Sequence, residues 1–229
     1  MRTIRTLLLQ RPTAAILTIA IVFAVWQCQA RAQEPMQNRA PKTQQTPTGR
    51  VVWDHVGRVF LNPTTGQFVY VGYLANIDPI DGSLFNGSPS ESTAYFTFST
   101  DLAQLTPLPT NNDVALDLVS AGTFSVYYNA NPGANWSDPA SFAKGKRIAT
   151  FHRKESIFQL IGPVSLHSLS ETLMWSSNFE FGDQTYNFNR IAPNGITFAQ
   201  FFSAAPKAGT TDYLVTFAGA GTVFAVGTP

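Results

Sequence analysis

Short stretches in which every second residue is apolar recur from about residue 59 onward, and they constrain the fold more than any other feature. In STAYFTFST, for example, Ala94, Phe96 and Phe98 are each separated by one more polar residue. This period of two places one set of side chains on one face of a β-strand. Turn-forming glycine, proline, asparagine and aspartate residues separate such stretches roughly every 10 residues. The pattern predicts an all-β domain of about nine to eleven short strands with almost no helix.

The strands favour a closed sheet over an open one. QFVYVGYL and several other stretches are apolar on both faces, whereas the strands of a two-sheet sandwich usually keep one polar face. Closure also removes exposed edges, which are a hazard for aromatic strands. We therefore predict a single antiparallel β-barrel, closed or nearly closed and about the size of a lipocalin, with a β-sandwich as the alternative. A transmembrane barrel is a further alternative, but its strands of about 10 residues exceed most of those expected here.

One loop, NANPGANWSDPASFAKGK, contains the only clear helix start. Asp138 can cap free N–H groups, Pro139 suits the first helical position, and Gly145 can end the turn. We expect one short helix near residues 138–144, held against the barrel by Trp136 and Phe142. The loop is then either a lid over one mouth of the barrel or a segment that covers core surface.

The N-terminus has the features of a secretory signal peptide. Its first eleven residues carry three arginines, an apolar run occupies Ala14–Trp26, and Ala30-Arg31-Ala32 follows. Basic start, apolar core and A-x-A site occur in the order that signal peptidase recognises. We expect residues 1–32 to be a signal peptide cleaved after Ala32, with an uncleaved anchor as the alternative.

The single cysteine, Cys28, lies inside this expected signal peptide. The mature chain would then be free of disulfides, which suits a bacterial periplasm or export beyond it. A lipoprotein anchored through Cys28 is an alternative, but Gln27 stands where a small residue is expected. We expect a secreted or periplasmic protein with no stable membrane insertion after cleavage.

Residues 33–50 are rich in Gln, Pro and Thr and are expected to form a disordered leader. Residues 51–229 are then one all-β domain. From Val51 onward the chain has 8 basic and 13 acidic residues, a net charge of −5. This balance argues against nucleic acid as a partner, because nucleic-acid binding needs a basic surface.

The most basic stretch, KGKRIATFHRK, supplies the candidate anchor for an anionic ligand. The guanidinium of Arg147 or Arg153 could hold a carboxylate or phosphate through two parallel hydrogen bonds, and His152 lies between them. Ion pairing with acidic residues elsewhere, or plain solvation, is the alternative. Trp136 and Phe142 complete the set of candidate ligand-binding residues.

The chain has 18 Phe, 7 Tyr and 4 Trp, more than a core of this size needs. The first hypothesis is therefore an exported β-barrel that binds a small apolar or amphipathic molecule. No cofactor motif and no metal spacing is found. A calcium loop around Asp81-Gly82 misses the required spacing, and Asp-Gly turns explain it more simply.

The second hypothesis is an enzyme of the cyclase or isomerase type that works in the barrel cavity. Its candidate acid–base residues are His152, His167 and Glu171, or else Asp54 with Arg58. No nucleophile motif such as G-x-S-x-G is present. The third hypothesis is a secreted surface or structural protein that has no small ligand and a filled barrel.

Overall fold

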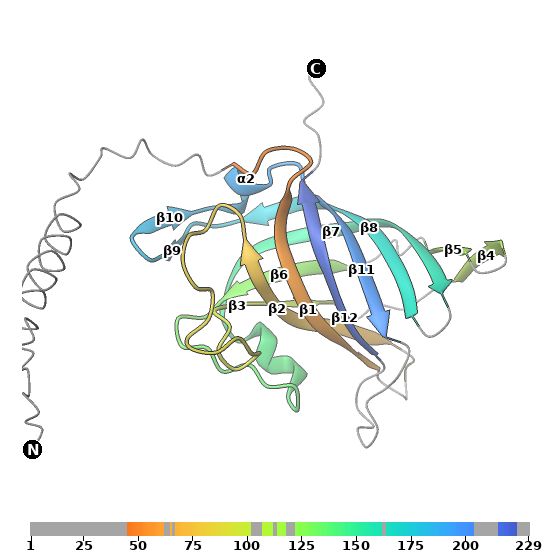
Figure 1. Cartoon of the computed structure of the whole chain (residues 1–229), viewed down its shortest axis with the longest axis horizontal. Helices are drawn as coiled ribbons and strands as arrows, with labels where there is room; N and C mark the ends of the chain where they lie inside the picture. Colours follow the sequence, from red (N-terminus) through yellow and green to blue (C-terminus); the bar gives the residue numbers. More distant parts are fainter. Residues whose placement is uncertain are drawn as a thin grey trace, which may run out of the picture. The chain divides into compact units, whose positions relative to one another are not determined.

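A computed structural model describes residues 45–61, 65, 67–101, 107–111, 114–117, 122–161, 164–203 and 215–223. Most of these residues form one antiparallel sheet, shown in Figure 1. Its strands in chain order are β1 (Val51–Leu61), β2 (Phe68–Ile77), β3 (Phe96–Thr100), β4 (Pro107–Asn111), β5 (Val114–Asp117), β6 (Thr123–Tyr128), β7 (Lys146–Ile161), β8 (Val164–Ser176), β11 (Ile196–Ser203) and β12 (Val215–Val223). A separate hairpin joins β9 (Phe179–Phe181) to β10 (Gln184–Tyr186).

The sheet closes on itself. Around the barrel the order is β7-β6-β3-β2-β1-β12-β11-β8, and β8 pairs back onto β7 from Ala149↔Ser176 to Ile161↔Val164. Apart from two excursions, each strand lies beside its predecessor in the chain, as in an up-and-down barrel. The predicted closed antiparallel barrel is confirmed, and the alternative β-sandwich is wrong because β7 and β8 are hydrogen-bonded along their length.

The two excursions explain the remaining elements. The β4–β5 hairpin extends the edge of β7, where β5 pairs with residues 156–159. The second excursion holds β9, β10 and the short helix α2 (Phe188–Ile191), which gather at one end of the barrel in Figure 1. Phe188 and Ile191 are fully buried there. The aromatic TYNFN stretch does not continue as a strand, because Asn187 caps α2 by accepting a hydrogen bond from Asn189 N.

Two turn-like stretches of the sequence do not produce hairpins. Gly219-Ala220-Gly221, between YLVTF and TVFAV, has the composition of a turn, but β12 continues through these residues. At Gly219 a Cβ would lie 2.4 Å from the Ala199 carbonyl oxygen, so glycine permits close strand packing here instead of a turn. Likewise β5 and β6 do not pair with each other, because each pairs with a different half of β7.

Inward-facing side chains of the barrel form an aromatic core. Trp53 is fully buried and contacts the rings of Phe124, Phe151, Phe188 and Phe198 at centroid distances of 5.6–6.1 Å. Such edge-to-face and stacked ring pairs add stability beyond the burial of their surface. The aromatic excess seen in the sequence therefore fills much of the lumen.

A second, smaller cluster covers the outside of the barrel wall. Val69 and Val71 alternate with the inward-facing Phe68 and Tyr70, and they pack with Phe142 of the loop after β6. This loop contains the 3₁₀ helix η1 (Pro139–Ala143), which confirms the short helix expected near residues 138–144. The apolar character of β2 on both faces thus has two separate causes, the lumen and the loop.

Residues 45–50 belong to the described fold, although the sequence assigned them to the leader. Thr46 is fully buried, its N–H donates to the Ile191 carbonyl at 3.2 Å, and its Oγ1 donates to the Asp78 carbonyl at 2.8 Å. These bonds let a polar residue be buried without an unpaired donor. The expected signal peptide and the leader up to residue 44 lie outside the described residues.

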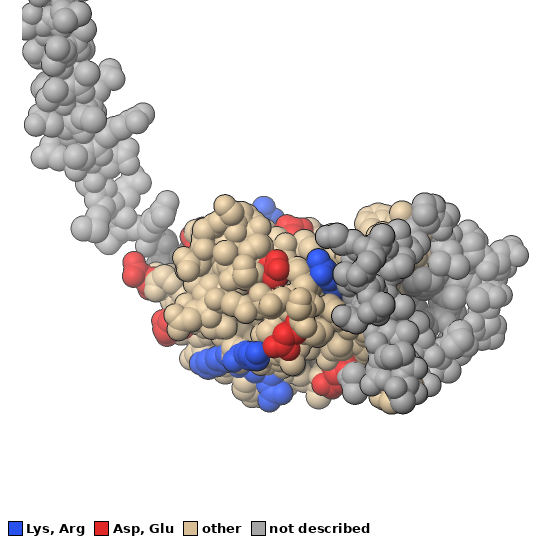
Figure 2. All heavy atoms as spheres, turned by 90° about the horizontal axis from the view of Figure 1, so that it is seen from below, with Lys and Arg blue, Asp and Glu red and all other residues tan. Residues whose placement is uncertain are grey.

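In the described part of the chain, no helix is long and apolar enough to cross a membrane. On the face that Figure 2 presents, Lys and Arg side chains lie among Asp and Glu side chains, and most of the described surface is uncharged.

Two facing glycines make room for rings inside the barrel. Gly57 of β1 pairs with Gly72 of β2, and a Cβ at Gly72 would lie 2.1 Å from the Val56 carbonyl oxygen and 2.5 Å from Phe98 Cζ. We expect Gly72→Ala to lower the free energy of unfolding by about 1–3 kcal/mol or more, because both neighbours are fixed. Urea unfolding checks this. Gly133→Ala is the control, because a Cβ at Gly133 would have no neighbouring atom within 4 Å, and it should change the free energy of unfolding little. Equal losses of stability in the two variants would contradict the close packing at Gly72.

Candidate functional site

One part of the barrel interior is polar. Five residues there are less than 6% exposed although their side chains carry charge or strong hydrogen-bonding groups. They are His55 of β1, Arg153 of β7, His167 and Glu171 of β8, and Gln200 of β11. Buried groups of this kind need partners, so their contacts define what the site can do.

Gln200 joins the two histidines. Gln200 and His167 are opposite each other in the β8–β11 register, and Gln200 Nε2 lies 3.1 Å from His167 Nδ1. His55 Nε2 lies 3.0 Å from Gln200 Oε1. As oriented here, the amide accepts from His55 Nε2–H and donates to His167 Nδ1, so His55 carries a proton on Nε2 and His167 is neutral.

Burial keeps these histidines uncharged. It lowers the pKa of His55 from 6.5 to about 4, against a smaller raising effect of the Gln200 hydrogen bond. It lowers the pKa of His167 to about 3, and the charge of Arg153 acts in the same direction. Neither imidazole therefore provides a positive charge for a ligand at neutral pH.

The positive charge of the site comes from Arg153, which is paired with Glu171 in the β7–β8 register. Arg153 Nε lies 3.5 Å from Glu171 Oε1, and Arg153 Cζ lies 4.9 Å from the ring centroid of Tyr70. Arg153 Nη1 and Glu171 Oε2 are both buried, and neither makes a hydrogen bond within the described residues. Such unmet polar atoms are costly and rare in folded proteins.

Burial raises the pKa of Glu171 from 4.5 to about 8, although the charge of Arg153 opposes this shift. The carboxyl group therefore holds its proton at neutral pH and can donate a hydrogen bond. Arg153 Nη1 and the Glu171 hydroxyl are then two buried donors whose acceptors do not lie among the described residues.

These two residues line a small cavity inside the barrel. Its walls also include Gln200, Tyr70 and Thr100, and rings of Phe98, Phe124, Phe198 and Phe217. The cavity volume is about 10 Å³, close to what a single water molecule occupies. A larger ligand can enter only if aromatic side chains move.

Of the candidate residues from the sequence, Arg153, His167 and Glu171 lie together inside the barrel. His152 follows the alternation and points outward, so it does not join His167 and Glu171 as the enzyme hypothesis requires. Arg147 is six residues before Arg153, so strict alternation would place both on one face of β7, but Arg147 is exposed. The β6–β7 register shifts between Val126↔Ala149 and Tyr127↔Arg147, and this bulge reverses the phase of the strand before Ile148.

The other pair of acid–base candidates also lies outside the lumen. Asp54 is exposed, and Arg58 Cζ lies 4.3 Å from the ring centroid of Trp136 on the outer wall. Among the described residues, no group of three or more His, Cys, Asp or Glu is placed to hold a metal ion.

The loop with Trp136 and Phe142 packs on the outer wall and does not close a mouth of the barrel. Thr97 Oγ1 donates to the Phe142 carbonyl at 2.7 Å, and the two loop rings lie 4.6 Å apart. The structure thus corresponds to the second interpretation of this loop, a segment that covers core surface.

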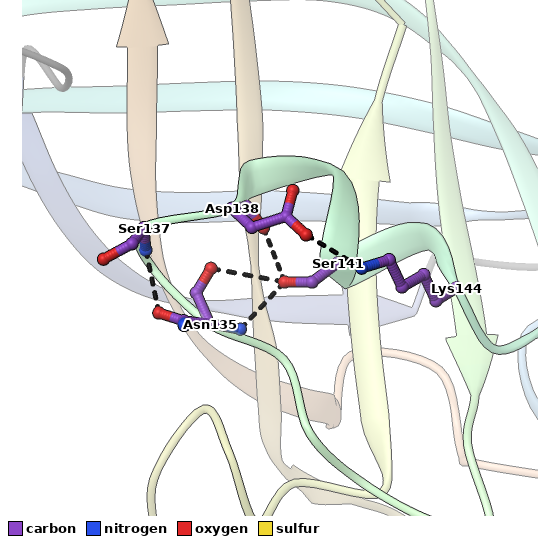
Figure 3. A network of polar contacts seen from close by, with 5 residues as sticks. All are labelled: Asn135, Ser137, Asp138, Ser141 and Lys144. Atoms are coloured by element: carbon purple, nitrogen blue, oxygen red, sulfur yellow. Dashed lines mark hydrogen bonds and ion pairs between the residues drawn. The ribbon is translucent and has the colours of Figure 1, made fainter.

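A network of polar contacts holds the turn of this loop, as Figure 3 shows. The Ser141 hydroxyl accepts from Asn135 N at 2.8 Å and donates to the Asp138 carbonyl oxygen. The Asp138 side chain makes no capping hydrogen bond of full geometry. It pairs with Lys144 Nζ at 2.8 Å, and this ion pair lowers the pKa of Asp138, which the nearby backbone N–H groups of Ala140 and Ser141 also help to lower.

The sequence did not single out His55, Gln200 or Tyr70 as site residues. Gln200 gave a usable sign, because it shares a strand face with Ile196, Phe198 and Phe202 and therefore had to be a buried amide. For His55 the indication was weaker, and it came from the alternation of side chains in VVWDHVG. Their connection to His167 depends on strand register, which the sequence alone does not provide.

The fold and the site together define a closed up-and-down β-barrel whose aromatic lumen holds a buried arginine–glutamic acid pair and a histidine–glutamine–histidine chain. No protein-family model, curated protein or solved structure matches this chain. The function must therefore be argued from the site itself.

Proposed function

We propose that the protein is an exported binding protein whose barrel interior holds a small amphipathic carboxylate. The observation that carries this proposal is the buried guanidinium of Arg153, whose Nη1 has no hydrogen-bond partner in the described residues and lines an aromatic cavity. Export rests on the signal-peptide features before residue 33. A periplasmic or secreted location follows from the same features.

The chemistry of the site favours a carboxylate. A guanidinium binds carboxylates through charge-assisted hydrogen bonds, which are stronger than neutral ones. The protonated Glu171 offers a second donor beside Arg153, while the neutral imidazoles of His55 and His167 add no charge. Phe98, Phe124, Phe198 and Phe217 would surround the apolar part of the ligand.

The size of the cavity limits the ligand. With room for about one water molecule in the closed state, the barrel must open for any group larger than this. The cost of opening reduces the apparent affinity, because only the open fraction of molecules can bind. Affinity should therefore be weak and should depend on how well the apolar part replaces the displaced rings.

The first test compares Arg153 with the exposed Arg147. We expect isothermal titration calorimetry to detect binding of at least one of formate, acetate, butyrate, benzoate and phenylacetate. Arg153→Met should weaken that binding by about tenfold to a hundredfold, the usual value of a charge-assisted hydrogen bond. Arg147→Met removes an equal charge outside the lumen and should leave the affinity unchanged.

Two results would contradict the proposal. One is that no carboxylate of this panel binds at millimolar concentration. The other is that Arg147→Met weakens binding while Arg153→Met does not, which would place the ligand on the outer surface. Circular dichroism of both variants should confirm that the barrel is intact.

An acid–base enzyme of the isomerase or cyclase type remains the second candidate, because Glu171 and His167 share the lumen and both have strongly shifted pKa values. Recovery of a bound carboxylate in chemically altered form would favour it. If the same ligand is recovered unchanged, the binding function is favoured.

The near-complete filling of the lumen supports the third candidate, a surface or structural protein without a small ligand. Among the described residues, five large apolar side chains are also exposed, and the most exposed are those of Met174 at 61%, Phe201 at 57% and Trp175 at 45%. The carboxylate titration separates this candidate from the first, since it predicts no binding in the lumen.

A further inference from the structure

A second cavity lies at the end of β8, beside α2, and shares no lining residue with the cavity in the lumen. Its volume is about 270 Å³, and it is lined by Leu173, Met174, Trp175, Ser176, Asn187 and Asn189. We propose that this Trp175 cavity binds a neutral saccharide. The proposal is independent of the carboxylate site, since different side chains carry it.

A β-bulge presents the apolar part of the Trp175 cavity to solvent. On β8 the partners of Thr150 and Phe151 are Trp175 and Leu173, so Met174 is an extra residue in the ladder. Met174 and Trp175 are 61% and 45% exposed. Bulges often redirect side chains at functional sites, and two adjacent exposed apolar residues form a small patch instead of an isolated exposure.

The indole of Trp175 is held in place from outside the cavity. Arg147 Cζ lies 5.3 Å from its ring centroid, and Arg147 does not line the cavity. The cation–π contact therefore limits the motion of the indole, which is still 45% exposed. A fixed aromatic surface loses little entropy when a ligand stacks on it.

Neutral polar groups form the polar wall of the cavity. Asn187 Oδ1 accepts hydrogen bonds from Ser176 Oγ at 2.6 Å and from Asn189 N at 2.8 Å, and Asn187 Nδ2 donates to Asn178 Oδ1 at 2.7 Å. These bonds fix the wall. The side-chain amide of Asn189 is exposed and makes no hydrogen bond within the described residues, so it is available to a ligand.

This combination matches the chemistry of a pyranose ring. Such a ring has faces of C–H groups that stack on an indole, and a rim of hydroxyl groups that pair with amides and hydroxyls. The side chains that line the Trp175 cavity are uncharged, and its polar groups are those of Ser176, Asn187 and Asn189. The half-exposed aromatic surface and the neutral polar wall together point to an uncharged sugar.

The experiment titrates the protein with cellotetraose, chitotetraose and maltotetraose, using calorimetry and tryptophan fluorescence. We expect at least one of these to bind, and Trp175→Ala to weaken it by about tenfold or more, as for a central aromatic contact. Trp175→Phe should recover part of the loss, and Asn189→Ala should weaken binding by a smaller factor. Phe201→Ala removes an exposed ring elsewhere and should leave affinity unchanged.

Three outcomes would overturn the proposal. They are absence of binding for all three tetrasaccharides at millimolar concentration, binding that Trp175→Ala does not weaken, and equal weakening by Phe201→Ala. If Trp175→Ala instead abolishes concentration-dependent self-association in sedimentation experiments without any sugar binding, the patch is an interface between copies of the chain. Because Arg153→Met leaves this cavity untouched, failure here and failure of the carboxylate site are distinguishable.

Discussion

Replacing Glu171 with glutamine is expected to stabilise the protein at high pH but not at low pH. At pH 5 the free energy of unfolding should agree with that of the native chain within about 1 kcal/mol, because the carboxyl group is protonated in the fold and glutamine has nearly the same shape. At pH 9 the variant should be more stable by about 4 kcal/mol. This is the cost of ionising a buried acid whose pKa rises from 4.5 to about 8.

The sign follows from proton binding. Since the pKa of Glu171 is higher in the folded state, the fold holds the proton more tightly, and this contribution is fully present below pH 4.5. It is lost as the pH rises through 8, because the native fold must then bury a carboxylate. His55 and His167 titrate in both chains, so their contribution cancels in the difference.

Urea unfolding at pH 5, 7 and 9 measures the effect. Glu180→Gln is the matched control, because Glu180 is exposed on β9. The free energy of unfolding of this variant should agree with that of the native chain within about 0.5 kcal/mol at each pH. If the difference between the native chain and Glu171→Gln does not change with pH, Glu171 is not a protonated acid in the lumen.

Replacing Trp53 with alanine is expected to lower the free energy of unfolding by about 3–5 kcal/mol. Trp53 is fully buried, and four phenylalanine rings surround it, so the deletion leaves a cavity that close-packed neighbours cannot fill. Its Nε1 has no hydrogen-bond partner among the described residues, and the loss therefore concerns packing alone.

Trp175→Ala serves as the comparison for Trp53. The Trp175 side chain is 45% exposed, and its deletion should cost about 1 kcal/mol or less in urea unfolding. Equal losses at the two positions would show that Trp53 is not the centre of a filled barrel core.

The alternation of side chains was enough to predict the class of fold and most strand positions. It also allowed closure to be preferred, because QFVYVGYL is apolar on both faces. The apolar character of both faces of β2 has a cause that was only partly expected. The inward residues of β2 do fill the lumen, while Val69 and Val71 are apolar because the loop that contains Phe142 covers them.

Glycine was the main source of error in strand boundaries. At Gly219 and Gly221 the sequence suggests a turn, whereas both residues permit close contact with β11 and Trp53 inside a continuous strand. A glycine that is required for close strand packing and a glycine that is required for a turn cannot be distinguished in the sequence. Only the packing of neighbouring strands distinguishes them.

Three of the five residues of the candidate site, Arg153, His167 and Glu171, were candidates from the sequence, and they lie on two strands that pair directly. Arg153 and Glu171 were both candidates from the sequence, and the β7–β8 register brings them together. Arg147 was placed on the wrong side of the sheet because a single-residue bulge at Ile148 reverses the alternation, and bulges leave no clear trace in sequence. His55 entered the site through Gln200, a contact between residues 145 positions apart.

A crystal structure of the protein saturated with the tightest-binding carboxylate of the panel tests the central claim most directly. The ligand is predicted to lie inside the barrel, with its carboxylate within hydrogen-bond distance of Arg153 Nη1 and Glu171 Oε2 and its apolar part between displaced phenylalanine rings. A ligand bound only on the outer surface, with the lumen still filled by side chains, would contradict the account.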